Sequence, residues 1–149
     1  MDIRYNIREL GAEETQTALS LVWRVFTEYE APDYTEEGAE EFRRSINDAD
    51  YLSKLRFYGA FVHERMVGVI AVRSLGTHIA LLFVDGEYHR NGIGKALFRT
   101  AAAECMADTM TVNSSPYALG FYHKLGFRDT AAEQNVNGLR FTPMENELR

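Results

Sequence analysis

The fold is decided by the stretch Val84-Asp85-Gly86-Glu87-Tyr88-His89-Arg90-Asn91-Gly92-Ile93-Gly94-Lys95-Ala96-Leu97. An apolar run leads into it, Gly92 and Gly94 allow a tight turn, and helical spacing begins at Ile93. The first N–H groups of a helix have no partner within the helix, and this end carries about half a positive charge. The stretch therefore predicts a strand, a turn and a helix whose exposed amides form a cradle for an anion, best suited to phosphate.

Two common phosphate-binding motifs do not fit this turn. A P-loop requires a glycine where the chain has His89, and a Ser or Thr where Ala96 follows Lys95. A dinucleotide-binding turn requires a third glycine where the chain has Leu97, and an early place in the chain. From this turn alone, an ordinary glycine-bearing turn without a ligand is an equally good interpretation.

A second informative segment, residues 113–127, reads NSSPYALGFYHKLGF. Its Ser-Pro pair and its closing Gly126 predict a helix over 116–125. Gly120 costs a helix interior about 1 kcal/mol relative to alanine, which suggests that another group approaches closely there. Tyr122 falls on the apolar face of this helix, where a core tyrosine is the plain alternative to a site residue.

Together the two segments resemble the GNAT family, the GCN5-related N-acetyltransferases. The pyrophosphate loop of that family reads Gln/Arg-x-x-Gly-x-Gly/Ala, and this chain has the hexapeptide HRNGIG over residues 89–94, departing from the pattern at His89. The later motif of the family, an Asn after a strand and a helix ending Phe-Tyr-x-x-Leu-Gly-Phe, is matched by Asn113 and by residues 121–127. The order of elements resembles the family over nearly the whole chain.

The resemblance implies acetyl-coenzyme A as co-substrate and no metal. Backbone groups of Phe83 and Val84 would pair with the pantetheine arm in a slot where this strand splays from the next. Asn113 would line the slot, and Tyr122 would face the sulfur. The cofactor-binding residues that the resemblance implies are Phe83, Val84, His89, Arg90, Asn91, Gly92, Ile93, Gly94, Lys95, Asn113 and Tyr122.

The implied reaction moves the acetyl group directly to a primary amine. Tyr122 would act as hydrogen-bond donor and general acid toward the departing thiolate, although full proton transfer is uphill by about 2 kcal/mol for ordinary pKa values near ~10 and ~8.5. Asp85, Glu87, His78 and His123 are not assigned as the base that the amine needs. A non-catalytic acyl-coenzyme A sensor or binding module on the same scaffold is the alternative.

The rest of the sequence predicts one mixed α/β domain over residues 1–149, an N-acetyltransferase domain if the resemblance holds. Apolar runs predict strands over 2–8, 58–63, 66–72, 78–84, 110–113, 127–132 and 139–144, with a tight hairpin turn at Asn137-Gly138. Helical spacing predicts helices over 12–30, 35–47, 93–106 and 116–125. The order indicates a central mixed and mostly antiparallel sheet with a parallel crossover at the cofactor site, flanked by about four helices.

The composition, with 46% apolar and 26% charged residues among 149, is typical of a soluble globular chain. The net charge of -6 counts against a nucleic-acid partner. Seven acids and no Lys or Arg lie between Glu28 and Glu41. In the family this segment borders the acceptor site, where it would attract a cationic small-molecule or peptide amine, and a solvated helix face is an equal alternative.

Other features bear on location and assembly. The single cysteine, Cys105, cannot form an internal disulfide, so a cytoplasmic location is expected. The longest apolar run, Ile79 to Val84, is far shorter than the ~20 residues that span a bilayer, and the first ten residues do not resemble a secretory signal, so no membrane partner is expected. An edge strand over 139–144 would allow two copies to pair as a homodimer.

Overall fold

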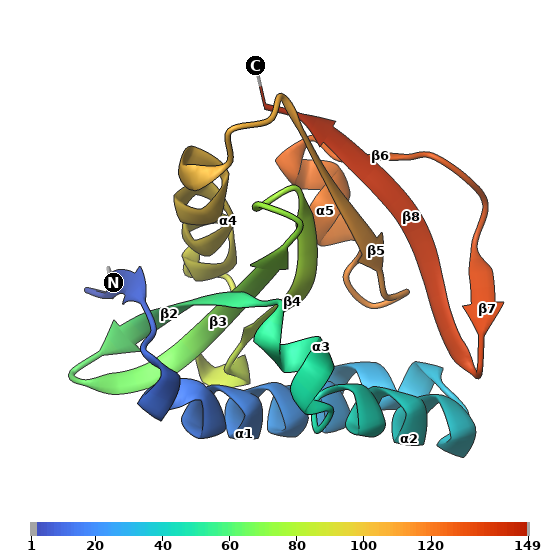
Figure 1. Cartoon of the computed structure of the whole chain (residues 1–149), viewed down its shortest axis with the longest axis horizontal. Coiled ribbons are helices and arrows are strands. Elements are labelled where there is room, and N and C mark those ends of the chain that lie inside the picture. Colours follow the sequence, from blue (N-terminus) through green and yellow to red (C-terminus); the bar gives the residue numbers. More distant parts are fainter. Residues whose placement is uncertain (1–2, 149) are drawn as a thin grey trace.

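The central sheet organises the molecule. The computed structural model describes residues 3–148, and its eight-stranded sheet has the order β1-β2-β3-β4-β5-β8-β6, with β7 paired to β8 (Figure 1). The strands are β1 (Asn6–Glu9), β2 (Arg56–Val62), β3 (Arg65–Arg73), β4 (His78–Val84), β5 (Thr109–Ser114), β6 (Arg128–Asp129), β7 (Gln134–Val136) and β8 (Leu139–Glu147). The α-helices over the same range are α1 (Thr15–Val25), α2 (Glu36–Ser45), α3 (Ala49–Ser53), α4 (Ile93–Glu104) and α5 (Leu119–Leu125).

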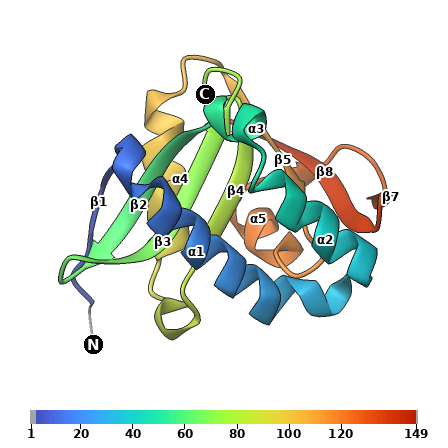
Figure 2. The ribbon, with the colours of Figure 1, turned by 60° about the horizontal axis from the view of Figure 1, so that its bottom comes forward.

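Helices cover both faces of the sheet. α1 packs on β3 and β4 from one side, and α4 packs on β2 and β3 from the other (Figure 2). In β3, Val69 joins the core beneath α1, whereas its neighbour Ile70 joins the core beneath α4. Because β3 is buried on both faces, its sequence is apolar at nearly every interior position instead of alternating.

The sheet opens between β4 and β5. These two strands are parallel, as the sequence predicts, while the other neighbouring strands are antiparallel. They pair only at His78 with Thr111 and at Ile79 with Val112, and then diverge (Figure 1). The second half of β4 therefore faces a gap, and the fold predicted from the sequence is confirmed together with this splay.

The first long helical segment changes its winding near the gap. The sequence predicts one helix over 12–30, and the chain there forms a 3-10 turn η1 (Ala12–Glu14), then α1, then a π-helical turn η2 (Phe26–Glu30). A further 3-10 turn, η3 (Ala31–Asp33), contains Pro32 and ends the segment. π-helical turns are rare and occur frequently at functional sites, and η2 lies beside the gap.

The structure moves the start of the first strand and adds one short helix. The strand predicted over 2–8 begins only at Asn6, because its partner β2 ends one residue beyond Phe61, which pairs with Asn6; Asp2 lies outside the described residues. The short helix α3 was not predicted, although Asp48 caps it by accepting hydrogen bonds from two amides of its first turn.

The helix predicted over 116–125 begins later, at Leu119. Residues 116–118 form a turn instead, in which the Ser115 hydroxyl accepts a hydrogen bond from the Ala118 amide at 3.2 Å. Gly126, with a left-handed φ of 105°, ends the helix as predicted.

The C-terminal hairpin is confirmed in its turn and corrected in its strands. Asn137 and Gly138 have φ values of 54° and 86°, as a two-residue hairpin turn requires. The first strand of the hairpin is β7, and only β6 forms within the predicted range 127–132. The prediction of an edge strand over 139–144 is wrong, since β8 pairs with β7 at one end and lies between β5 and β6 at the other. The homodimer stays a prediction, but it can no longer rest on this strand.

Candidate active site

The loop between β4 and α4 forms an open cradle of amides. Gly92 has a left-handed φ of 79°, which favours glycine, and a side chain there would meet nothing within 4 Å. Among the described residues, no backbone hydrogen bond uses the amides of residues 90–95 as donors. Together with the start of α4, these amides present a partial positive charge, and Arg90 and Lys95 border the same space.

Small residues keep this space open. A Cβ atom at Gly94 would lie 3.0 Å from the Phe121 ring, so the first turns of α4 and α5 pack closely. Gly120 is the second residue of α5 and not its middle, and a side chain there would meet nothing within 4 Å. Both glycines line a cavity of about 540 Å³, called here the cradle cavity.

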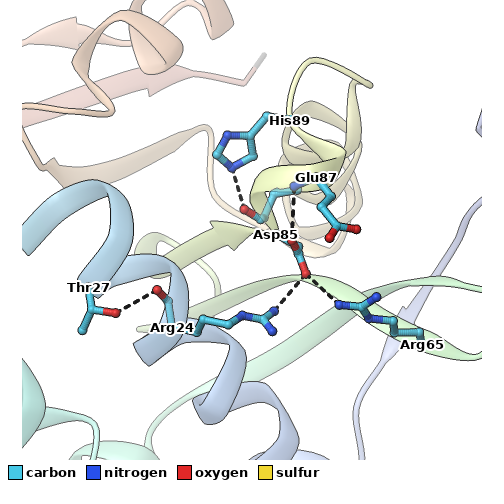
Figure 3. Close-up of polar contacts among 7 residues, drawn as sticks. Arg24, Thr27, Arg65, Asp85, Glu87 and His89 are labelled. Atoms are coloured by element: carbon cyan, nitrogen blue, oxygen red, sulfur yellow. Dashed lines mark hydrogen bonds and ion pairs between the residues drawn. The ribbon is translucent and has the colours of Figure 1, made fainter.

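Asp85 ties the cradle to two other elements (Figure 3). One oxygen of its carboxylate accepts hydrogen bonds from Arg24 of α1 at 2.9 Å and from Arg65 of β3 at 3.2 Å. The other oxygen accepts from the Glu87 amide at 3.2 Å, inside the 3-10 turn η4 (Gly86–Tyr88). Because its side chain is only 10% exposed and fully engaged, Asp85 is a structural anchor of the loop.

His89 holds the loop against the end of β4. Its Nε2 donates a hydrogen bond to the Val84 carbonyl at 2.6 Å (Figure 3). The centroid of its ring lies 4.8 Å from that of the Tyr29 ring. Since a carbonyl can only accept, the hydrogen is on Nε2. The side chain at the position where the chain departs from the family motif therefore has an architectural role.

The ladder between β3 and β4 decides which backbone groups face the gap. The Asp85 amide donates a hydrogen bond to the Val67 carbonyl of β3, and Phe83, two residues earlier, pairs with Val69 and directs its backbone N–H and C=O to the same side. The residues between them direct these groups to the opposite side, because the direction alternates along an antiparallel strand. Leu82 and Val84 therefore point theirs into the gap, where His89 already occupies the Val84 carbonyl. The sequence prediction named Phe83 and Val84 as the residues whose backbone faces the slot. It missed Leu82, because a sequence does not show which residues of a strand direct their N–H and C=O groups to which neighbour.

A second cavity adjoins the first. It has a volume of about 380 Å³ and lies between α2, the β4–β5 gap and the β7–β8 hairpin. The residues that line both cavities are Glu30, Leu82, Phe83, Ala118 and Tyr122.

Tyr122 stands where the cavities meet. It is 5% exposed, and its ring packs edge-on against Phe121 and Phe127. No described side-chain oxygen is both buried and unpaired, and no hydrogen bond among residues 3–148 uses the Tyr122 hydroxyl, so this hydroxyl reaches the cavity. Burial, and to a lesser extent the charge of Glu30, raises the pKa of Tyr122, which keeps the hydroxyl protonated.

Glu30 is the residue that sequence analysis missed. It ends η2, and it forms none of the ion pairs among residues 3–148. Burial raises the pKa of Glu30 to about 7; the Ser115 hydroxyl opposes this shift by hydrogen bonding, and Asp33 adds to it. The signal was its spacing, since Val22, Phe26 and Glu30 recur every four residues and place a carboxylate on the buried face of the helix.

Two of the other predicted residues lie elsewhere. The side-chain amide nitrogen Nδ2 of Asn91 donates a hydrogen bond to the His89 carbonyl at 3.1 Å, and Asn91 does not line the cradle cavity. Asn113 lines the second cavity and not the first. Of the seven acids between Glu28 and Glu41, only Glu30 and Glu41 line the second cavity.

The described chain contains no group of three or more His, Cys, Asp or Glu placed to hold a metal ion, and no helix in it is long and apolar enough to span a membrane.

Comparison with known families decides what this arrangement is. A model of the acetyltransferase (GNAT) domain matches residues 30–148. The chain belongs to the GNAT acetyltransferase family. The cradle, the gap, Glu30 and Tyr122 all lie inside the matched range of this member of the GNAT family.

Two curated relatives are N-acetyltransferases. The chain is 28% identical over 134 residues to the peptidyl-lysine N-acetyltransferase YjaB of Salmonella typhimurium, with 87% of each chain covered. It is 33% identical over 90 residues to human N-acetyltransferase 8, where the match covers 50% of this chain and 39% of that protein.

Solved structures share the fold. A GCN5-related N-acetyltransferase from Rhodopseudomonas palustris superposes with a TM-score of 0.82 at 23% identity, covering 99% of this chain and 98% of that one. The PaiA N-acetyltransferase from Thermoplasma acidophilum, solved in complex with coenzyme A, superposes with a TM-score of 0.77 at 21% identity, covering 97% and 99%.

Proposed function

We propose that this GNAT protein transfers the acetyl group of acetyl-coenzyme A directly to a primary amine within a ternary complex. One observation carries the proposal: the cradle cavity and the second cavity meet at Glu30, Phe83 and Tyr122, at the β4–β5 gap. A donor in one cavity and an acceptor in the other would come together there. Direct transfer needs no enzyme nucleophile, and the one thiol, Cys105, is buried and lines neither cavity.

The cradle cavity fits the donor. The unengaged amides of residues 90–95, with Lys95 beside them, suit a diphosphate. The backbone groups of Leu82 and the free Val84 amide suit the amide-bearing pantetheine arm. Relatives solved with coenzyme A support this use of the fold. The bound thioester supplies an activated acetyl group.

Tyr122 serves the leaving group. Its hydroxyl donates a hydrogen bond to the sulfur as negative charge develops there, a role that requires a protonated group. Since burial raises the pKa of Tyr122, complete proton transfer to a thiolate is more uphill than the ~2 kcal/mol that ordinary pKa values give. Hydrogen-bond donation is therefore its main contribution, and it is strengthened by the low local polarity.

Glu30 serves the amine. A lysine-like amine with a pKa near ~10.4 is neutral only about once in 10³ at pH 7, so attack needs a proton acceptor. Burial raises the pKa of Glu30 to about 7, so this carboxylate at the junction of the cavities can accept a proton near neutral pH. Nitrogen bonds to the acetyl carbon as the carbon–sulfur bond breaks; one ammonium proton leaves through Glu30 to solvent, and the second ends on the thiol.

A non-catalytic acyl-coenzyme A sensor is the alternative. A sensor needs the cradle cavity, but it does not need a second cavity that meets the first at a carboxylate with no ion-pair partner among residues 3–148, and this feature favours the enzyme.

The test has two stages. Thermal shift against acetyl-coenzyme A, ATP and NAD comes first, and a ligand at 100 times its Kd stabilises by about 2.7 kcal/mol. Stabilisation by acetyl-coenzyme A alone is expected. Thiol release with a panel of primary amines comes second, and binding without amine-dependent release would establish the sensor.

A further inference from the structure

The second cavity has aromatic walls. Rings from η2, α2, α3 and β8 surround it, and they come from segments far apart in the sequence. Phe26 and Phe42 stack with ring centroids 3.9 Å apart. A volume of about 380 Å³ is at the small end of the range for small-molecule sites. The aromatic residues lining it are Phe26, Tyr34, Phe42, Tyr51, Phe83, Tyr122 and Phe141.

The charges of this cavity leave one negative group uncompensated. Glu41 forms an ion pair with Arg44 of the same helix. Arg140 is neutralised by Glu133, with 3.1 Å between nitrogen and oxygen. Glu30 has no ion-pair partner among residues 3–148. The cavity can therefore balance one positive charge, and it has no free cation for a carboxylate.

The hairpin closes one side of the cavity. Gly38 of α2 and Gly138 of the β7–β8 turn approach so closely that a Cβ atom at Gly38 would overlap the Gly138 carbonyl. Arg140 also donates a hydrogen bond to the Asp33 carbonyl at 3.0 Å, which joins the hairpin to η3. An extended chain therefore cannot pass between α2 and the hairpin turn at this point.

We propose that the acceptor is a small primary monoamine whose amine is carried by an aromatic or similarly apolar body. Its ammonium group lies at Glu30, and its body lies among the rings contributed by Phe42, Tyr51 and Phe141. Inside the cavity, a polyamine would find no second acid without an ion-pair partner, and an amino acid would find no free cation for its carboxylate. A protein chain could not pass between Gly38 and the hairpin turn. This inference rests on the proposed acetyl transfer.

The test compares primary-amine acceptors that differ in charge and in the apolar body they carry. Initial rates of thiol release from acetyl-coenzyme A are measured with 2-phenylethylamine, hexylamine, spermidine, phenylalanine and a lysine-containing peptide. The expected kcat/KM for 2-phenylethylamine exceeds that for spermidine, phenylalanine and the peptide at least 10-fold, and exceeds that for hexylamine by a smaller factor.

A pair of variants ties this preference to the cavity. Phe141→Leu removes one ring from the wall but keeps an apolar side chain, and it is expected to lower the ratio of 2-phenylethylamine to hexylamine activity several-fold. Phe98→Leu is the matched control, because Phe98 is on the buried face of α4 and lines neither cavity. It is expected to leave that ratio unchanged.

The outcomes separate the two proposals. Preference for spermidine, phenylalanine or the peptide would overturn the acceptor class and leave acetyl transfer standing. An equal fall of the ratio in both variants would also overturn the assignment of the rings. Binding of acetyl-coenzyme A without release by any amine would overturn the proposed function and this inference with it.

Discussion

Tyr122 and Glu30 both lie where the two cavities meet, and the proposed mechanism needs a protonated hydroxyl on one and an ionised carboxylate on the other. In the proposed mechanism Tyr122 keeps its proton in order to donate a hydrogen bond to sulfur, and burial together with the charge of Glu30 raises its pKa in that direction. In the same mechanism Glu30 loses its proton before it accepts one from an ammonium group, and its pKa of about 7 is suited to this near neutral pH. Burial thus raises both pKa values: it keeps the Tyr122 hydroxyl protonated and brings the pKa of Glu30 close to neutral pH.

Removal of the Tyr122 hydroxyl is expected to slow the chemical step. Tyr122→Phe keeps the ring and its edge-on contacts with Phe121 and Phe127, so the fold and donor binding should persist. Loss of general acid assistance is expected to lower kcat at least ~10-fold. Steady-state kinetics with a calorimetric Kd for acetyl-coenzyme A measure the two effects separately. An unchanged kcat, under conditions where chemistry limits the rate, would remove this role.

Glu30 is expected to set the pH dependence of turnover. With the wild type, kcat/KM should rise with pH below about 7 and level off above it, because the base must be ionised. An amine that lost its proton in solution would instead keep the rate rising toward its own pKa near ~10.4. Glu30→Gln is expected to lower kcat at least ~100-fold and to abolish the inflection near pH 7.

Stability gives an independent control for the same substitution. The pKa of Glu30 is higher in the folded chain than its ordinary 4.5, so the folded state binds the proton more tightly. Folding stability is therefore lost as pH rises from about 4.5 to 7 and stays lower above that window. Glu30→Gln has no such loss, and its Tm should exceed that of the wild type at pH 8 but not at pH 4.

Single residues could be predicted from the sequence only where a local motif marks them. Gly92 and Tyr122 belong to such motifs, and the structure places both on the cradle cavity. Glu30 looked like one acid among seven, because its burial depends on β4, β5 and the hairpin closing around η2. The free backbone of Leu82 was equally hidden, since it depends on pairing with β3.

At the scale of elements, the position of the cradle depends on a link between three segments. Asp85 connects the loop after β4 with α1 and with the start of β3 through Arg24 and Arg65. Each arginine side chain is about half exposed, at 51% and 55%, so this link contributes more to loop geometry than to stability.

Asp85→Asn is expected to weaken donor binding and leave chemistry largely intact. The amide can still accept from the Glu87 backbone, but it loses the charge that holds both arginines. KM for acetyl-coenzyme A should rise about 10-fold, with kcat within about twofold, as expected for lost uniform binding. Glu87→Gln is the matched control, since its side chain is exposed and forms no ion pair among residues 3–148. A fall in kcat at unchanged KM would contradict this role.

Element type followed from local sequence, whereas element ends did not. Apolar spacing identified the long helices and the three central strands, because period and composition are local properties. The starts of β1 and α5, and the choice of β7 as hairpin strand, depend on partners that are distant in sequence. The splay of β4 from β5 came from the family resemblance and could not be derived from spacing.

At the scale of the whole molecule, negative charge is concentrated on one side of the second cavity. The net charge is -6, and η2, η3 and α2 carry seven acids from Glu28 to Glu41. Only Glu30 and Glu41 line the cavity, so any effect of the other five acids on an acceptor would come from their electric field and not from contact. Such a field raises the local concentration of a cation and is screened within a Debye length of about 10 Å at 0.1 M salt.

Salt is therefore expected to raise KM for a cationic acceptor several-fold between about 0.05 and 0.5 M, with kcat little changed, because screening weakens encounter but not the buried step. The double substitution Glu36→Gln with Glu37→Gln, at exposed positions of α2, should flatten this dependence. Glu64→Gln with Glu104→Gln removes the same charge from the β2–β3 turn and the end of α4, which do not border the cavity, and should leave it intact. Equal slopes for both double variants would show that net charge, and not its placement beside α2, governs the encounter.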